Sequence, residues 1–368
     1  MNLFGSTFKD KKVLITGNTG FKGSWLSVWL HGLGANLYGI SKDIPTSPSM
    51  FEELNLKGIV THFKEDVRNY KAIHEIIEKV KPDFVFHMAA QPIVVTSYID
   101  PVDTISTNVM GTTNILEALK NVNHPCTAII ITSDKSYDNV EWVWGYKETD
   151  RLGGKDIYSG SKGAAELIYK SYYHSFFSNQ KQSNVRVASV RAGNVIGGGD
   201  WAAYRIVPDC MKAWVKGESV EIRSPKATRP WQHVLEPLSG YLTIAQNLSK
   251  DINLNGESFN FGPHAEYTKT VKELLEDLSK YWQLKQEPSY MSEELSEFHE
   301  AGLLKLNCDK ALFYLKWLPT LDYNKLIEFT STWYYEFYNG NNDMLNYTLA
   351  QIKEYENIAK KKNIIWTK

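Results

Sequence analysis

Short apolar runs alternate with longer amphipathic stretches over the first half of the chain. Each run is apolar along nearly its whole length, as expected for strands buried on both faces of a parallel sheet. We predict such strands at Val13–Thr16, Leu37–Ile40, Val60–Phe63, Phe84–His87, Ala128–Thr132 and Val185–Val190. Between them, apolar residues at three- and four-residue spacing predict helices over Gly23–Leu33, Tyr70–Val80, Pro101–Leu119 and Tyr158–Phe177.

This alternation predicts an α/β fold with a Rossmann-type, doubly wound parallel sheet. After Gly193 the regular pattern gives way to loops rich in glycine and proline, a helix near Pro208–Lys216, and a half rich in Trp, Tyr and Leu. We therefore expect residues 1–193 to form the Rossmann domain, with some later segments returning to it. Residues 194–368 should form mainly a smaller C-terminal α/β substrate-binding lobe.

Charge and cysteine content narrow the classes of partner. The 368 residues include 41 basic and 42 acidic side chains, so no global field attracts nucleic acid or an anionic membrane. Cys126, Cys210 and Cys308 are widely separated and odd in number, which favours neither a disulfide framework nor a metal site. The sequence also lacks a signal-peptide pattern and an apolar run long enough to span a membrane. We expect a cytoplasmic protein without metal, nucleic-acid or membrane partners.

The first predicted strand runs into a glycine-rich turn that opens a helix. The sequence from Lys12 is KVLITGNTGFKG, which contains three glycines in the spacing GxxGxxG. In such a context Gly17 permits a tight turn, Gly20 lets backbone amides approach a pyrophosphate, and Gly23 allows the helix to pack closely on the strand. This context favours dinucleotide binding over an ordinary glycine-rich turn. After the second strand, Asp43 could bind ribose hydroxyls and Lys42 a 2′-phosphate, so NAD is preferred to NADP without being settled.

A tyrosine and a lysine four residues apart open a predicted helix. Tyr158 and Lys162 should share one helix face. A nearby ammonium favours the phenolate form, so the pair could act as a base near neutral pH. Ser133, Asp134 and Lys135 follow a strand at the sheet edge where open α/β proteins place their active sites.

Several segments together resemble the extended short-chain dehydrogenase/reductase superfamily and, within it, the CDP-glucose 4,6-dehydratases. They are the Thr132–Lys162 stretch with its WVWGY and LGG motifs, TSPSMF from Thr46, the region from Arg191 to Trp201, and RPWQHVLEP from Arg229. Related enzymes acting on dTDP-glucose carry Asp-Glu where this chain has Asp134-Lys135, and Asp-Lys is the pattern of the CDP-glucose branch. A protonated lysine cannot accept a proton, which leaves the base that acts at C5 open.

The resemblance implies roles for individual residues. Tyr158 would remove the C4 hydroxyl proton, Lys162 bind the nicotinamide ribose, Ser133 bind the C4 oxygen, Asp134 protonate the leaving C6 hydroxyl, and Lys135 help remove the C5 proton. The nucleotide sugar would contact Asn194, Arg205, Arg229 and His233, although Arg205 could instead form a surface ion pair and His233 could lie in the core. NAD would contact the sequence Gly17, Asn18, Thr19, Gly20, Phe21, Lys22, Gly23, then Asp43, Asp66, Val67, Ala89, Ala90, Gln91 and Asn108, together with Tyr158 and Lys162.

The resemblance further implies a homodimer formed through the Pro101–Leu119 and Tyr158–Phe177 helices, and a role in making a deoxysugar for a surface polysaccharide such as O-antigen. Two alternatives stay open. One is another nucleotide-sugar 4,6-dehydratase or a 4-epimerase, although an epimerase has no need of Asp134 and Lys135. The other is a non-catalytic NAD(H)-sensing protein, which could dispense with Tyr158, Lys162 and Asp134.

Overall fold

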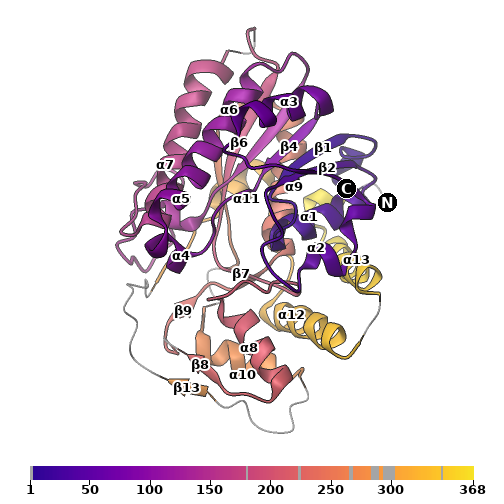
Figure 1. Cartoon of the computed structure of the whole chain (residues 1–368), viewed down its shortest axis with the longest axis vertical. Coiled ribbons are helices and arrows are strands. Elements are labelled where there is room, and N and C mark those ends of the chain that lie inside the picture. The colour runs from indigo at the N-terminus through magenta and orange to yellow at the C-terminus, as the bar shows by residue number, and fades with distance from the viewer. Residues whose placement is uncertain are drawn as a thin grey trace.

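The computed structural model describes residues 3–179, 181–222, 225–264, 268–282, 290–292, 303–340 and 343–368. An upper lobe surrounds a seven-stranded parallel sheet, and a lower lobe hangs below the carboxyl ends of its strands (Figure 1). The strand order is β11-β6-β5-β4-β1-β2-β3. These strands are β1 Lys12–Thr16, β2 Asn36–Ser41, β3 Val60–Lys64, β4 Phe84–His87, β5 Cys126–Ile131, β6 Val185–Ala192 and β11 Ser258–Phe261.

Helices cover both faces of the sheet (Figure 1). One face carries α3 Tyr70–Val80, α6 Gly111–Lys120 and α7 Ile157–Tyr172, with α4 Val94–Ile99, α5 Pro101–Ile105 and the π-helical turns η3 Ser106–Met110 and η5 Tyr173–Phe177. The other carries α1 Phe21–Gly32, α9 Leu235–Lys250, α11 Asp309–Leu315 and α13 Met344–Lys361. Two separate apolar clusters fill the spaces between the sheet and these layers.

In the residues that the structure describes, the lower lobe is built from two-stranded pairs and three helices (Figure 1). The pairs are β7 Val195–Ile196 with β10 Gln232–His233, β8 Val220–Ile222 with β13 Tyr290–Ser292, and β9 Thr228–Arg229 with β12 Lys269–Thr270. The helices are α8 Ile206–Lys216, α10 Val271–Ser279 and α12 Tyr323–Tyr338. The remaining short helices are α2 Met50–Glu53, η1 Leu3–Ser6, η2 Leu56–Gly58, η4 Asp134–Ser136, η6 Ile252–Leu254 and η7 Ile365–Thr367.

The predicted doubly wound sheet is confirmed, with all six predicted strands present and their ends displaced by at most two residues. The expected burial of Val60–Phe63 on both faces is wrong, because β3 is an edge strand and only its first residue is buried. The seventh strand, β11, was not among the predicted strands, and it adds to the opposite edge beside β6. The helix predicted over Pro101–Leu119 is present as α5, η3 and α6 in succession.

The topology creates a crevice between neighbouring strands. β1 pairs with β2 on one side and with β4 on the other. The chain leaves β1 toward the face that carries α1 and leaves β4 toward the face that carries α6 (Figure 1). Because the two connections diverge, the carboxyl ends of β1 and β4 border an open space where ligands of doubly wound proteins bind.

Candidate active site

A cavity of about 740 Å³ lies at the carboxyl ends of the central strands, between the sheet and the lower lobe. The glycine loop, the ends of β2 to β6 and the segment after β6 all contribute to its wall. The cavity wall includes most of the candidate residues, namely Gly17, Thr19, Gly20, Phe21, Lys22, Gly23, Asp43, Asp66, Val67, Ala89, Ala90, Ser133, Asp134, Lys135, Tyr158, Lys162, Asn194, Arg205 and Arg229.

The glycine loop has the backbone geometry that a dinucleotide requires. Gly17 has φ of +75°, and a Cβ there would lie 2.9 Å from the Ala89 nitrogen. A Cβ on Gly23 would lie 2.2 Å from the Gly17 oxygen, so only glycine lets α1 approach this closely. At Gly20 a Cβ would meet no atom nearer than 3.4 Å, and no side chain caps the helix end. The amides at the start of α1 therefore face space suited to a pyrophosphate.

The segment after β2 is tied to the glycine loop. The Asn18 side chain lies against Gly39, where a Cβ would be 2.3 Å from its Cγ. The Ser41 hydroxyl donates to Asn18 Oδ1 at 2.9 Å, and Thr19 Oγ1 donates to the Asp43 carbonyl at 2.7 Å. These contacts fix the chain beside Asp43, which is exposed on the cavity rim together with Lys42.

Asp66 lines the cavity shortly after the end of β3. Its carboxylate accepts hydrogen bonds from the Arg68 guanidinium, including one of 2.6 Å from Nη2. The hydrogen bonds from Arg68 hold the pKa of Asp66 below its ordinary value. Asn69 rather than Asp66 caps α3 by accepting from the Ala72 amide. The Asp66 carboxylate therefore has no helix-capping role.

The catalytic helix α7 begins at a capped turn. The Asp156 carboxylate accepts from the Ser159 amide at 2.9 Å and so places Tyr158 in the first turn of the helix. Both Tyr158 and Lys162 are buried and line the cavity. Lys162 Nζ lies 6.0 Å from the centroid of the Tyr158 ring.

Burial and neighbouring groups act on the pKa of Tyr158 in opposite directions. Burial raises its pKa to about 12, while a hydrogen bond with Ser133 and the charge of Arg205 lower it. Burial also lowers the pKa of Lys162 to about 8. Desolvation of the phenol therefore outweighs the hydrogen bond and the charge that lower its pKa.

Ser133, Asp134 and Lys135 form the wall beside the tyrosine. The Ser133 hydroxyl donates to Asp134 Oδ1 at 3.0 Å, and the Lys135 amide donates to Ser133 Oγ at 3.2 Å. Burial raises the pKa of Asp134 above its ordinary value, and this favours a neutral carboxylic acid that can donate a proton. Gly193 leaves room for this group, because a Cβ there would lie 3.1 Å from Asp134 Oδ2.

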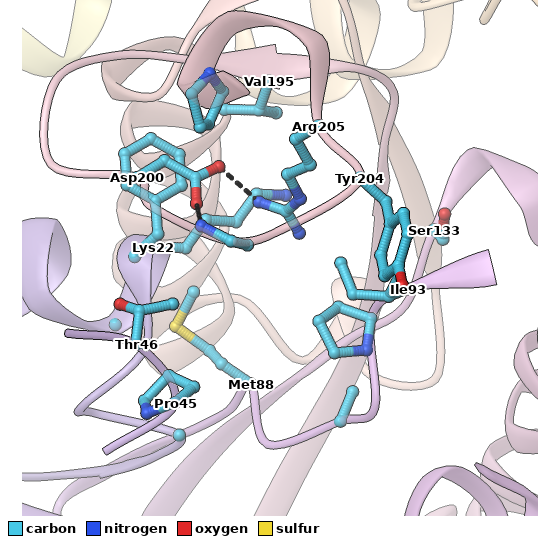
Figure 2. A pocket seen from close by; sticks show the side chains of 18 of the residues that line it. Lys22, Pro45, Thr46, Met88, Ile93, Ser133, Val195, Asp200, Tyr204 and Arg205 are labelled. Carbon is cyan, nitrogen blue, oxygen red and sulfur yellow. Dashed lines mark hydrogen bonds and ion pairs between the residues drawn. The ribbon is translucent and has the colours of Figure 1, made fainter. Parts of the chain in front are cut away.

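Cationic side chains gather on the lower-lobe side of the cavity. Arg205 Nη1 forms an ion pair of 2.6 Å with Asp200, and Figure 2 shows the Lys22 side chain reaching toward this pair. Burial and the charge of Arg205 lower the pKa of Lys22 to about 8. Arg229 is buried on β9, and Asn194 follows β6. The Arg205 ion pair is therefore part of the cavity and not a contact on the outer surface.

Four candidate residues lie behind the cavity wall. Asn108 is buried, accepts from the Gln91 amide at 2.8 Å and donates to Ser161 Oγ at 2.9 Å. Gln91 in turn donates to Thr104. Asn18 packs behind the glycine loop, as described above.

The fourth, His233, is a core residue because Trp25 and Phe329 pack edge-on against its ring. Burial lowers its pKa to about 3, so it is neutral at physiological pH. In these positions His233, Asn18, Gln91 and Asn108 support the wall rather than form it.

Some residues of the site were not identified from the sequence. Asp200 holds Arg205, and Thr132 lines the cavity directly before Ser133. A carboxylate five residues before an arginine in a glycine-rich loop is only a weak sequence signal for an ion pair in the site.

Within the described ranges, no group of three or more His, Cys, Asp or Glu side chains is arranged to hold a metal ion. No helix in the described part of the chain has both the length and the apolar character of a membrane span.

Comparisons with known proteins agree with this architecture. A family model described as GDP-mannose 4,6 dehydratase matches residues 14–330. The CDP-glucose 4,6-dehydratase of Salmonella typhimurium is 44% identical over 350 residues, covering 95% of this chain and 97% of that protein. The CDP-paratose 2-epimerase of Salmonella typhi is 28% identical, covering 73% of this chain and 84% of that protein.

Solved structures show the same fold at lower sequence identity. The dTDP-glucose 4,6-dehydratase of Streptomyces venezuelae, solved with NAD bound, has a TM-score of 0.75 at 18% identity over 88% of this chain and 97% of its own. The UDP-glucose 4-epimerase of Thermotoga maritima, solved with UDP-glucose, also has a TM-score of 0.75, at 21% identity over 89% of this chain and 100% of its own.

Proposed function

Because the chain belongs to the GDP-mannose 4,6-dehydratase family, we propose that it is a CDP-glucose 4,6-dehydratase, an NAD-dependent hydro-lyase. It converts CDP-D-glucose to CDP-4-dehydro-6-deoxy-D-glucose and water. One observation carries this assignment. A buried carboxyl group with a raised pKa, Asp134, lies next to Lys135 and shares the Ser133 hydroxyl with Tyr158 in one cavity. The oxidation at C4 needs Tyr158, and the elimination across C5 and C6 needs Asp134 and Lys135. Both must reach the same sugar.

The cofactor is NAD⁺, held by the glycine loop, Asp43, Asp66, Val67 and the Ala89-Ala90 segment. The open space beside Gly20 fits its pyrophosphate. When bound, NAD⁺ would supply the hydride acceptor for the oxidation at C4 and the hydride donor for the reduction at C6, so the overall reaction would have no net oxidation. We assign residues 1–193 to the cofactor domain and residues 194–368 mainly to the substrate lobe, with α9 and β11 returning to the sheet.

The side chains divide the proton transfers between them. Tyr158, in its phenolate form, takes the proton of the C4 hydroxyl, and Ser133 hydrogen-bonds the C4 oxygen. Asp134 donates a proton to the departing C6 hydroxyl, which its raised pKa favours. Lys135 takes the C5 proton, either as the neutral amine or through a water molecule, and C5 is protonated again when the hydride is added at C6. Lys162 donates to the nicotinamide ribose.

The diphosphate of the substrate lies against the cations of the lower-lobe side. Arg205 and Arg229 donate hydrogen bonds to its oxygens through their planar guanidinium groups. Asn194 adds an amide donor. The Asp200 carboxylate holds Arg205 in a defined orientation on the cavity wall.

A panel of nucleotide sugars tests the assignment. Purified protein is incubated with CDP-, dTDP-, GDP- and UDP-glucose, and the products are followed by mass spectrometry. We expect loss of one water from CDP-glucose. Loss of water from dTDP-glucose alone would keep the mechanism and change the substrate. A product of unchanged mass would indicate a 4-epimerase, and NAD binding without any product would indicate a sensing protein.

We also infer a homodimer that works in the cytoplasm in deoxysugar synthesis for a surface polysaccharide. Large apolar side chains are exposed along α4, α5 and α7, with Ile99 71%, Val102 75% and Leu167 56% exposed. Burying such faces against a second copy would form a four-helix contact. Sedimentation velocity of the purified protein should therefore give a dimer.

A further inference from the structure

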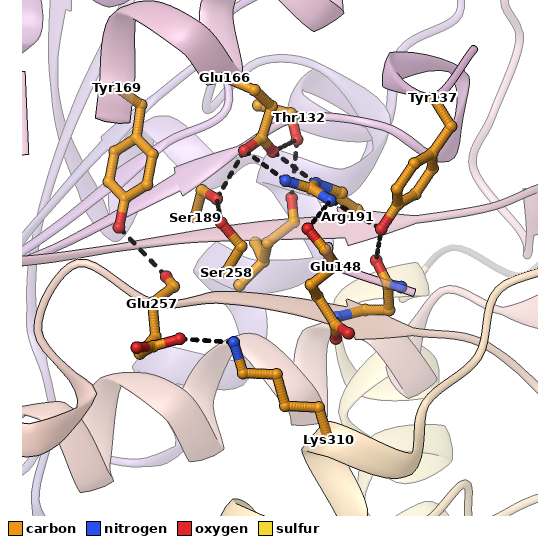
Figure 3. A network of polar contacts seen from close by, with 12 residues as sticks. Thr132, Tyr137, Glu148, Glu166, Tyr169, Ser189, Arg191, Glu257, Ser258 and Lys310 are labelled. Carbon is orange, nitrogen blue, oxygen red and sulfur yellow. Dashed lines mark hydrogen bonds and ion pairs between the residues drawn. The ribbon is translucent and has the colours of Figure 1, made fainter. Parts of the chain in front are cut away.

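A buried ion pair lies directly behind the catalytic groups. Glu166 and Arg191 have side chains that are 0% exposed. Arg191 Nε donates to Glu166 Oε1 at 2.9 Å and Nη2 donates to Oε2 at 2.8 Å, so the guanidinium and the carboxylate meet as two forks (Figure 3). Burial alone would raise the pKa of Glu166, but the Arg191 charge holds it below its ordinary value. The pair is therefore ionised.

Glu166 is part of the catalytic helix. Tyr158, Lys162 and Glu166 follow one another at four-residue intervals on α7, and all three are buried. This spacing places them on one face of the helix. The position of the Glu166 carboxylate thus fixes the rotation and height of the helix that carries the tyrosine and the lysine.

The same ion pair holds both ends of the segment that carries Ser133, Asp134 and Lys135. At the first end, the Thr132 hydroxyl donates to Glu166 Oε1. At the second end, Arg191 Nη1 donates to the Tyr137 hydroxyl at 2.7 Å (Figure 3). The Tyr137 hydroxyl then donates to Asn260 on β11 at 2.9 Å. Figure 3 shows Thr132 beside the Glu166 carboxylate and Tyr137 beside the Arg191 guanidinium.

The proposed reaction needs this link because two sets of groups act on one sugar ring. Tyr158 and Lys162 serve the oxidation at C4. Asp134 and Lys135 serve the elimination across C5 and C6. Both sets of groups can reach a sugar bound in one pose only if α7 and the Ser133–Lys135 segment keep a fixed separation. A misplacement of about 1 Å can lower the rate by a factor of about a hundred.

We propose that Glu166 and Arg191 are positioning residues that set the placement of the elimination groups relative to Tyr158. This inference rests on the proposed function, because it assigns the pair to coupling between the two halves of the dehydratase reaction. A buried ion pair can also serve stability alone. The two roles predict different effects on the individual steps of the reaction.

The test compares two buried tyrosines. Tyr137→Phe removes the hydroxyl that joins Arg191 to the end of the Ser133–Lys135 segment and leaves the Glu166 pair intact. Tyr169→Phe is the matched control. Tyr169 is also buried, lies on α7, and hydrogen-bonds the Glu257 carbonyl (Figure 3), but it does not contact the segment. Both variants lose one buried hydroxyl, so both should lose comparable thermal stability.

Kinetic isotope effects separate the two halves of the reaction. For Tyr137→Phe we expect kcat for CDP-glucose to fall on the order of tenfold, with KM changed by less than about twofold, because the hydroxyl positions groups without touching the substrate. The isotope effect from deuterium at C5 should grow and that from deuterium at C4 should shrink. Tyr169→Phe should keep the kcat and both isotope effects of the unmodified enzyme.

The inference fails if the two variants lose kcat to the same extent, or if Tyr137→Phe lowers kcat with both isotope effects unchanged. Should Tyr137→Phe be insoluble, Glu166→Gln takes its place, with circular dichroism as the check of folding. It keeps the shape of the side chain and removes the charge that binds Arg191, and we expect the same change in isotope effects. If the unmodified protein eliminates no water from a nucleotide sugar, the proposed function itself is refuted.

Discussion

The buried carboxyl group of Glu236 gives a prediction that can be worked out in numbers. Glu236 lies at the start of α9 and is 2% exposed. Its oxygens accept hydrogen bonds from the Thr320 and Leu321 amides and from the Tyr355 hydroxyl, the last at 2.9 Å. Glu236 thereby joins α9 to the loop before α12 and to α13. The perturbation is Glu236→Gln, which keeps the shape and an acceptor oxygen but cannot ionise.

The pKa of Glu236 sets the size and the sign of the effect. Burial raises it from an ordinary value of 4.5 to about 7. Between these two pH values the unfolded chain has released the proton and the folded protein still holds it. The free energy of unfolding therefore falls as the pH rises through this window. At about 1.4 kcal/mol for each pH unit, the full contribution is about 3 kcal/mol, present below pH 4.5 and lost above about pH 7.

Urea unfolding at a series of pH values between 4.5 and 8 measures this contribution. Other titrating groups are common to both proteins, so the difference between the unmodified chain and Glu236→Gln isolates one carboxyl group. We expect that difference to change by about 3 kcal/mol in favour of the variant as the pH rises, and to level off above pH 7. A difference that stays constant across the series would refute the assignment of a raised pKa to Glu236.

Three further predictions concern the catalytic acid, the glycine loop and the dimer contact. Asp134→Asn should lower the rate of water elimination at least about a hundredfold, because the acid for the C6 hydroxyl is lost. Mass spectrometry of the products measures that rate, and an unaffected rate would contradict the role assigned to Asp134. Gly20→Val should weaken NAD binding, measured by calorimetry, on the order of tenfold without loss of thermal stability. Gly23→Ala should instead destabilise the fold, because the new Cβ would lie 2.2 Å from the Gly17 oxygen. Val102→Glu should shift sedimentation from dimer to monomer; a persistent dimer would place the contact on another face.

Local patterns were sufficient to predict the parts of the fold that depend on neighbouring residues. The strand before Gly17 and the turn after it were readable because apolar runs and glycine spacing act over a few residues. β11 was not predicted, because it consists of four residues in a half without regular alternation and is held by backbone pairing with β6. Its place depends on contacts that no local pattern records.

The site was predictable to a similar extent. Tyr158 and Lys162 were found because their spacing fits one helix face, and Glu166 continues that spacing by one more turn. Its partner Arg191 is 25 residues away along the chain, so no local signal joins the two. The position of His233 and the raised pKa of Tyr158 follow from burial, which depends on the packing of both lobes.

The divergence of the chain at β1 and β4 leads to an asymmetry in how the site tolerates mutation. The half of the cavity beside these strands is shaped by main-chain atoms and by glycines whose replacement would clash. The half toward the lower lobe contains glycines as well, but much of it is shaped by side chains such as Arg205 and Arg229. Substitution can therefore retune the second half one contact at a time, while the first half permits little change. A laboratory search for variants that accept a new nucleotide should concentrate its libraries on the lower lobe.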